Sequence, residues 1–245
     1  MSNFNAKKVK DDMVKWIQDW FEQNGKGCNA VVGISGGLDS SVVSALCVEA
    51  LGKDRVIAVK MPDGYQQDED VADILISHLD IKSYRVDIHD AKTDLFYQMI
   101  MENGITPSEQ TKINIAPRVR MTSLYAISQS VNGRVMNTSN LSESYVGYDT
   151  RFGDSVGDIS PLFNLTKTEI RLIGKELGLP EELVNKTPID GLCGQTDEDR
   201  FGFTYDVLDK YIRTGICENE VIKNKIDTMH EKNLFKLQPM PSFQL

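Results

Sequence analysis

Residues 28–41 read CNAVVGISGGLDSS, and this stretch decides the fold. Its first half, 28–34, is a short apolar run that fits a strand buried on both faces. The following residues, 40–51, are apolar on most of the surface that a helix would present. The serine- and glycine-rich segment 35–41 therefore joins a predicted strand to a predicted helix.

The rest of the chain alternates predicted strands with helical patterns of similar length. This alternation predicts an α/β fold, a Rossmann-like doubly wound parallel sheet with helices on both faces. Because no linker-like stretch or internal repeat divides the sequence, we expect one domain over 1–245. The predicted strands are 28–34, 55–61, 83–88 and 133–138; the predicted helices are 6–24, 40–51, 68–79, 91–102, part of 107–131 (starting near Pro107 or Pro117), 166–177, 203–213 and 218–232.

The composition narrows the classes of partner. The formal net charge is −9, which disfavours a nucleic-acid partner, since such a partner usually needs a basic face. The first residues lack the apolar core of a signal peptide, and no stretch has the length of a membrane span, so we expect a cytoplasmic protein without a membrane partner. The four cysteines and three histidines show no zinc-ligand spacing.

Segment 35–41 has the properties of a phosphate-binding turn. The amino terminus of the predicted helix has free N–H groups and a partial positive charge. Gly36 and Gly37 let the backbone approach an anion closely, and Ser35, Ser40 and Ser41 add hydroxyl donors. The segment predicts a phosphate cradle; the alternative is a glycine-rich turn that binds nothing.

Asp39 is an unexpected member of such a turn, because a carboxylate repels phosphate. Its presence implies a cation between the two, and Mg²⁺ is the cation that most often bridges carboxylates and phosphates. Glu143 follows the fourth predicted strand, on the side where a parallel sheet presents ligands, and so is a candidate second ligand; the alternative is a surface acid. The segment matches neither the Walker A pattern nor the dinucleotide fingerprint.

The pattern S-G-G-x-D-S-S resembles the pyrophosphate loop of the N-type ATP pyrophosphatases, whose fold is adenine nucleotide alpha hydrolase-like. In that superfamily ATP is cleaved to AMP and pyrophosphate, and the usual product is an adenylated substrate. Later segments resemble the NAD synthetase family within it. They are NIAPRVRMTSLY at 114–125, NTSNLSE at 137–143, GYDTRFGD at 147–154, LTKT at 165–168, and the K-x-P…DE…G-x-x-Y pattern within 186–205.

The NAD synthetase resemblance implies ATP-dependent amidation of deamido-NAD by ammonia through an acyl-adenylate, with Mg²⁺ as cofactor and ATP as co-substrate. We expect free ammonia, or ammonia from a separate subunit, because 245 residues leave no room for an amidase domain. It also implies a homodimer, with 113–131 and the helix around Trp16 as candidate contact surfaces. The alternatives are another adenylate-forming ATP pyrophosphatase and a non-catalytic nucleotide-binding module.

The same resemblance implies roles for individual residues. Asp39 and Lys167 act in catalysis, Asp39 and Glu143 hold the metal, and Asp154 is a candidate acceptor for the proton of ammonium. Lys167 lies in the first turn of a predicted helix, where a cation is unfavourable, and this misfit favours a functional role. The implied ATP contacts are Gly33, Ile34, Ser35, Gly36, Gly37, Leu38, Asp39, Ser40, Thr138, Lys167 and Ile189; the implied deamido-NAD contacts are Arg118, Arg151, Asp158, Phe235 and Lys236.

Several positions depart from the pattern of the family. Asn137 replaces a glycine, and Arg151 replaces a lysine, which keeps the charge but changes the donor geometry. Ile189 stands where a hydroxyl residue is common and has no side-chain donor, while Phe235 replaces a histidine, so that stacking replaces hydrogen bonding. Arg120 lies on a different side of its predicted helix from Arg118, and it is either functional or structural. The polar segment 185–200 is predicted to be a mobile loop and a candidate lid.

Overall fold

The computed structural model describes residues 4–64, 69–186 and 196–243, and its centre is a parallel sheet of four strands. The strand order is β3-β2-β1-β4, so the first strand lies inside the sheet, flanked by β2 and β4. The predicted α/β fold and all four predicted strands are confirmed. The strands are β1 (Asn29–Gly33), β2 (Val56–Lys60), β3 (Lys82–Arg85) and β4 (Gly133–Met136).

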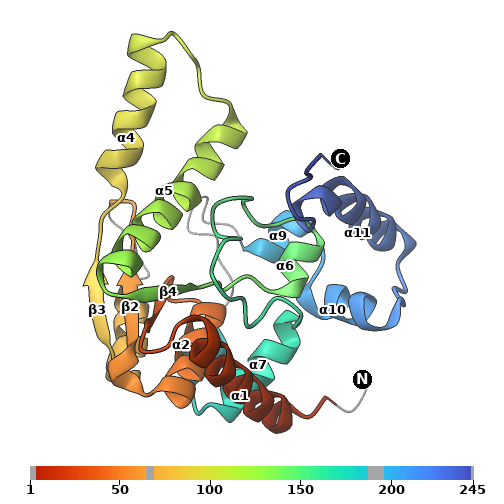
Figure 1. The fold of residues 1–245 in the computed structure, drawn as a ribbon. Helices are drawn as coiled ribbons and strands as arrows, with labels where there is room; N and C mark the ends of the chain where they lie inside the picture. Colours follow the sequence, from red (N-terminus) through yellow and green to blue (C-terminus); the bar gives the residue numbers. More distant parts are fainter. Residues whose placement is uncertain (1–3, 65–68, 187–195, 244–245) are drawn as a thin grey trace.

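Helices cover both faces of the sheet (Figure 1). Successive strand residues point to opposite faces, and both faces of β1 are buried. Ala30 and Val32 belong to the core formed with α1, α2, α3 and α7, whereas Val31 packs with Leu124 of α5 on the other face. The sheet is therefore doubly wound, as predicted. These helices are α1 (Ala6–Asn24), α2 (Leu38–Leu51), α3 (Glu69–Leu79), α5 (Glu109–Ser130) and α7 (Lys167–Glu176).

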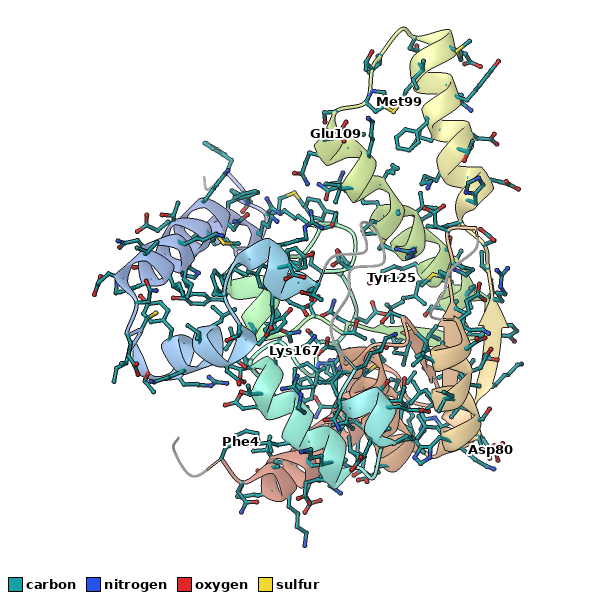
Figure 2. All side chains as sticks on the ribbon, turned by 180° about the vertical axis from the view of Figure 1, so that it is seen from behind. Phe4, Asp80, Met99, Glu109, Tyr125 and Lys167 are labelled. Atoms are coloured by element: carbon teal, nitrogen blue, oxygen red, sulfur yellow. The ribbon has the colours of Figure 1, made fainter. Side chains whose placement is uncertain are left out.

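An arm made of α4 (His89–Tyr97), the π-helix η2 (Gln98–Glu102) and the first part of α5 stands away from the sheet (Figure 1). Figure 2 labels Met99 and Glu109 in the outer part of this arm. Ser108 caps α5 by accepting a hydrogen bond from the backbone N–H of Thr111. The long helix thus begins near Pro107, and Pro117 lies inside it.

The carboxyl-terminal helices form a second apolar cluster beside the sheet. Phe201, Leu208 and Ile226 are buried there. The prediction of a loop over 185–200 is wrong for its last part, since α9 begins at Asp197, stabilised by a capping box between Thr196 and Asp199; residues 187–195 lie outside the described residues. The elements of this part are α6 (Leu141–Tyr145), α8 (Glu181–Val184), α9 (Asp197–Phe201), α10 (Tyr205–Thr214), α11 (Glu220–Asn233) and η3 (Leu234–Lys236).

Among the helices of the described residues, none combines the length and the apolar character needed to cross a membrane.

Candidate active site

A cleft of about 1150 Å³ opens at the carboxyl ends of β1, β2 and β4. This is the edge where open parallel sheets bind ligands. Its walls come from the loop after β1, from α5, from the segment after α6 and from the carboxyl-terminal helix α11. Figure 2 shows Lys167 at the start of α7, near the middle of the molecule. The fold therefore brings residues from distant parts of the sequence to one cavity.

The loop after β1 has the conformation of an anion cradle. Gly36 has a φ of +75°, which favours glycine, and Gly37 caps α2 without a side-chain hydrogen bond. The first N–H groups of α2 are thus not capped by a side chain of the N-cap residue. Ser35 lies exposed at the cleft, but Ser41 is fully buried and donates its hydroxyl to the carbonyl of Gly37 at 2.7 Å. The prediction that Ser41 offers a hydroxyl to phosphate is therefore wrong.

The other implied ATP contacts lie around the loop. Gly33, Ile34, Leu38 and Ser40 line the cleft, and so does Thr138 after β4. The Ser40 hydroxyl donates to the carbonyl of Gly37 at 3.2 Å, so it tightens the turn. Ile189 lies outside the described residues.

Lys167 is enclosed by two acids at the cleft floor. Its Nζ donates to Oδ2 of Asp39 at 2.5 Å and to Oε1 of Glu143 at 2.9 Å, and its side chain is only 4% exposed. Asn140 donates to the other oxygen of Asp39 at 3.3 Å. Two acids from distant segments, one in α2 and one in α6, thus converge on a single ammonium group.

Burial and charge shift the pKa values of this cluster. Burial alone would lower the pKa of Lys167, but the charges of Asp39 and Glu143 outweigh it and raise that pKa above its usual value. Burial raises the pKa of Asp39 to about 6 against the opposing effect of Lys167, and the Glu143 charge adds to the rise. The pKa of Lys167 thus rises because two carboxylates face one ammonium, whereas the pKa of Asp39 rises because its burial outweighs the attraction of that ammonium. Lys167 is charged at neutral pH.

The same two carboxylates suit a magnesium ion. A cation, the Lys167 ammonium, already lies between their oxygen atoms, so their geometry accepts positive charge. Within the described residues there is no group of three or more His, Cys, Asp or Glu side chains that could hold a metal by itself. Mg²⁺ is commonly bound by one or two carboxylates together with substrate phosphates. Asp39 and Glu143 fit that pattern.

The start of α7 is held from two other helices. The N–H of Lys167 donates to Oγ of Ser142 at 2.9 Å, and the N–H of Thr168 donates to Asp209 at 2.8 Å. Ser142 in turn donates to Asp209 at 2.5 Å. The buried carboxylate of Asp209 supplies the negative charge that a helix amino terminus favours, which offsets the misfit of a lysine there. Nothing local in the sequence indicates this contact, because Asp209 lies on α10.

Arg151 lines the cleft and contacts two aromatic rings. Its guanidinium carbon is 5.0 Å from the ring centre of Phe152 and 5.5 Å from that of Phe235. Arg118 also lines the cleft and donates to the carbonyl of Arg151 at 3.4 Å. Lys236 donates to the carbonyls of Gly147 and Asp149, and thereby ties η3 to the segment after α6.

The two predicted aspartates of this segment lie in different surroundings. Asp154 is an exposed residue that lines the cleft. Desolvation by the surrounding protein raises the pKa of its carboxyl to about 6, against the opposing effect of the hydrogen bond from the N–H of Thr150. Asp158 is not among the residues that line the cleft. Its carboxylate accepts from the N–H of Val135 at 2.7 Å and from the Tyr125 hydroxyl at 3.4 Å, so it fastens the loop to β4.

Residues beyond the predicted set also reach the site. Lys186 donates to the carbonyl of Gly36 at 3.2 Å. Tyr205 donates to the buried Asp197 at 2.9 Å and lies 3.3 Å from Glu143. Lys186 and Tyr205 both belong to the motif within 186–205, and this motif is the sequence pattern from which their place at the site could have been predicted. Arg120 donates to the carbonyl of Met61 at 2.9 Å, which shows a structural contact for that residue at the cleft wall.

The fold and this cleft define an α/β protein of the adenine nucleotide alpha hydrolase-like type. The model of the family described as NAD synthase matches residues 9–244. The chain belongs to the NAD synthase family, whose members are ligases that form a C–N bond.

Known proteins similar to the chain agree with this assignment. The chain is 39% identical over 236 residues to the NH3-dependent NAD+ synthetase of Finegoldia magna, and the match covers 94% of this chain and 95% of that protein. The solved NMN synthetase of Francisella tularensis superposes with a TM-score of 0.90 at 32% identity, covering 99% of this chain and 100% of that one. The NH3-dependent NAD synthetase of Campylobacter jejuni gives a TM-score of 0.77 at 28% identity, covering 98% and 99%.

Proposed function

We propose that the chain synthesises NAD⁺ from deamido-NAD, ATP and ammonia. The observation that carries the proposal is the position of Lys167, which lies between Asp39 and Glu143 directly beside the loop after β1. A buried cation and two acids at a phosphate cradle suit the departure of pyrophosphate. A cleft of about 1150 Å³ exceeds the range of roughly 300–1000 Å³ that is usual for the site of one small ligand, as a reaction of two substrates requires.

The first step joins the substrate carboxylate to AMP. A carboxylate oxygen of the nicotinate attacks the α-phosphorus of ATP, and the bond to the β-phosphate oxygen breaks, which releases pyrophosphate. The free N–H groups at the start of α2 hold the phosphates, and the Lys167 ammonium stabilises the charge on the leaving group. Arg118 and Arg151 orient the second nucleotide against ATP, so the step depends largely on positioning.

The second step replaces AMP by nitrogen. Ammonia attacks the carbonyl carbon of the acyl-adenylate, and AMP leaves with the pair of electrons of the broken C–O bond. Ammonium must first lose a proton, and Asp154 is the acceptor that we propose. Its pKa of about 6 leaves it ionised at neutral pH and closer to the pKa of a useful base than an ordinary aspartate.

The metal that we propose for the site is Mg²⁺, held by Asp39 and Glu143. When bound, it would neutralise phosphate charge and so assist the departure of pyrophosphate. Lys167 shares both carboxylates, and hence it has to give up one or both contacts when the metal and the phosphates enter.

One assay tests the proposed function. The purified chain is incubated with ATP, Mg²⁺, ammonium and deamido-NAD, and NAD⁺, AMP and pyrophosphate are measured. We expect the three products in equal amounts. Folded protein that forms pyrophosphate but no NAD⁺ would point to another adenylate-forming enzyme, and folded protein that forms neither would contradict the synthesis of NAD⁺ from deamido-NAD.

A second candidate substrate is nicotinate mononucleotide, which would give NMN. The observation that favours it is the TM-score of 0.90 with an NMN synthetase, against 0.77 with an NAD synthetase. The same two steps apply, because both nucleotides carry the same nicotinate carboxylate. Values of kcat/KM for deamido-NAD and for the mononucleotide, measured side by side, decide which one the cleft prefers.

We also propose that the chain acts as a homodimer and that the arm of α4, η2 and α5 takes part in the contact. The arm exposes a group of large apolar side chains, and a concentration of this kind is typical of an interaction surface. The sequence pointed to 113–131 and to Trp16. Trp16 is 46% exposed and stays a candidate contact, whereas Ala116 and Leu124 are buried against the body of the molecule. The exposed residues of the arm are Leu95, Tyr97, Ile100, Met101 and Ile105.

Sedimentation velocity tests the dimer. Met101 is 67% exposed, so Met101→Asp places a charge on the arm without disturbing the core. We expect a dimer for the unchanged protein and a shift toward monomer for the variant. A monomeric unchanged protein would contradict the dimer, and an equally dimeric variant would contradict the role of the arm.

A further inference from the structure

Asn137 departs from the glycine of its family, and the structure shows a use for its side chain. The residue follows β4 and is 4% exposed. Its Nδ2 donates to the carbonyl of Asp154 at 2.8 Å and lies 3.3 Å from the carbonyl of Val156. Its Oδ1 accepts from the N–H of Ser139 at 3.0 Å and from the hydroxyl of Ser160 at 2.7 Å.

These partners leave one orientation for the carboxamide. Two backbone carbonyls, which only accept, face one end of the group, and a backbone N–H, which only donates, faces the other. Turning the amide by 180° would set oxygen against oxygen and nitrogen against nitrogen. The group is thus fully engaged, as expected for a buried polar side chain.

The loop held by Asn137 is the one that carries the substrate-side residues. This substrate loop, residues 150–160, includes Arg151 and Asp154 at the cleft. Its end pairs with the sheet, because the N–H of Asn137 donates to the carbonyl of Ile159 at 2.8 Å. Gly157 packs so closely on Asn137 that an added Cβ would lie 2.7 Å from the Asn137 backbone nitrogen. The side chain and backbone of Asn137 therefore bind the loop along its second half.

We propose that Asn137 is a positioning residue that fixes the substrate loop to the end of β4 and so places Arg151 and Asp154 before substrate arrives. Glycine at this position would have no side chain to make these contacts. The part of this inference that concerns substrate binding rests on the proposed function. The part that concerns the order of the loop does not depend on it. Preorganisation of this kind improves binding by lowering the ordering that accompanies it.

The first test measures loop order without any substrate. Hydrogen exchange of peptides within 150–158 is compared between the unchanged protein and Asn137→Gly, which introduces the residue of the family. Each lost hydrogen bond is a modest net contribution, and together we expect exchange of the loop to become about tenfold faster. The matched control is Asn132→Gly, at the other end of β4, where φ is already +50° and glycine fits the backbone.

The second test separates positioning from general stability. For Asn137→Gly we expect the KM for the nicotinate nucleotide to rise about tenfold while the KM for ATP changes less than about twofold. A purely structural role would reduce the amount of active protein and leave both KM values unchanged. The KM is measured with whichever nucleotide the chain amidates, deamido-NAD or nicotinate mononucleotide. If the chain amidates neither of them, the proposed function is contradicted, but the hydrogen-exchange test of the loop still applies.

A second variant keeps the test decisive if the glycine variant does not fold. Asn137→Asp has nearly the same shape and keeps the acceptor for Ser139, but it sets a carboxylate oxygen against the carbonyls of Asp154 and Val156. We expect it to loosen the loop at least as much as Asn137→Gly. Unchanged loop exchange, or equal changes of both KM values, in the folded variant would overturn the proposal.

Discussion

Replacing Lys167 by methionine removes the only ammonium that the described residues place between Asp39 and Glu143. The side chain is 4% exposed, so the loss is not softened by solvent. Removing one partner of a buried ion pair typically costs about 3–5 kcal/mol, because the remaining charge stays buried. For a chain of this size that corresponds to a fall in Tm of roughly 6–20 °C.

The loss of stability in Lys167→Met should grow as pH rises, because of the charge on Asp39. Burial already raises the pKa of Asp39, and without Lys167 nothing of comparable charge opposes the rise. The folded variant then binds protons that the unfolded chain releases, so its stability falls as pH rises from the ordinary aspartate pKa through the raised one. The deficit of the variant relative to the unchanged protein should be larger at pH 8 than at pH 5.

Thermal and urea unfolding at the two pH values measure the effect. The matched control is Lys8→Met, which removes an exposed pair with Asp12 one helical turn away and should cost only about 0.3–0.5 kcal/mol. Because Lys167 no longer competes for the two acids, Mg²⁺ without ATP should raise the Tm of Lys167→Met more than that of the unchanged protein. A cost below about 1 kcal/mol, or equal responses to pH and Mg²⁺ in both proteins, would refute the reasoning about the cluster.

Three further substitutions test single contacts. Asp39→Asn should lower kcat by about 10²–10³, without recovery at high Mg²⁺, because the carboxylate is a ligand and not only a charge; pyrophosphate release measures it. The unchanged enzyme should lose activity as pH falls below about 6, where Asp154 becomes protonated. Asp154→Asn should lower kcat and remove this pH dependence. A variant with an unaltered pH profile would exclude Asp154 as the base. Phe235→Ala removes a ring beside Arg151 and should raise the KM for the nicotinate nucleotide by roughly 2- to 10-fold with little change in the KM for ATP.

Local sequence patterns predicted the layers of the fold. The apolar run at 28–34 and the glycine-rich turn after it are local patterns, formed by residues next to one another in the chain. They predicted β1, the loop after it and α2, and the structure has these elements at nearly the same residues. The capping box of Thr166 and Glu169 at the start of α7 is also a local pattern, and it is present in the structure. Such features depend on hydrogen bonds and on periodicity within a few residues, which one sequence contains.

Contacts between distant segments were predicted less well. Ser41 has the right residue type for a site, but it is buried and donates to Gly37. Asp158 also fastens its loop to β4, a contact that the sequence did not indicate. The role of Asp209 at the start of α7 had no signal, because α10 approaches α7 only in the folded chain. The helix at 197–201 was missed because its capping box lies in a segment rich in turn-forming residues.

The sequence by itself determined that a glycine-rich loop with an acid at Asp39 lies between a buried strand and a helix, and its later motifs indicated the family. Only the tertiary structure decided that Lys167 lies between Asp39 and Glu143, and that Asn137 holds the substrate loop. The reason is physical. Backbone conformation is set largely by neighbouring residues, whereas the charge, burial and partners of a side chain are set by whichever segments the fold brings against it.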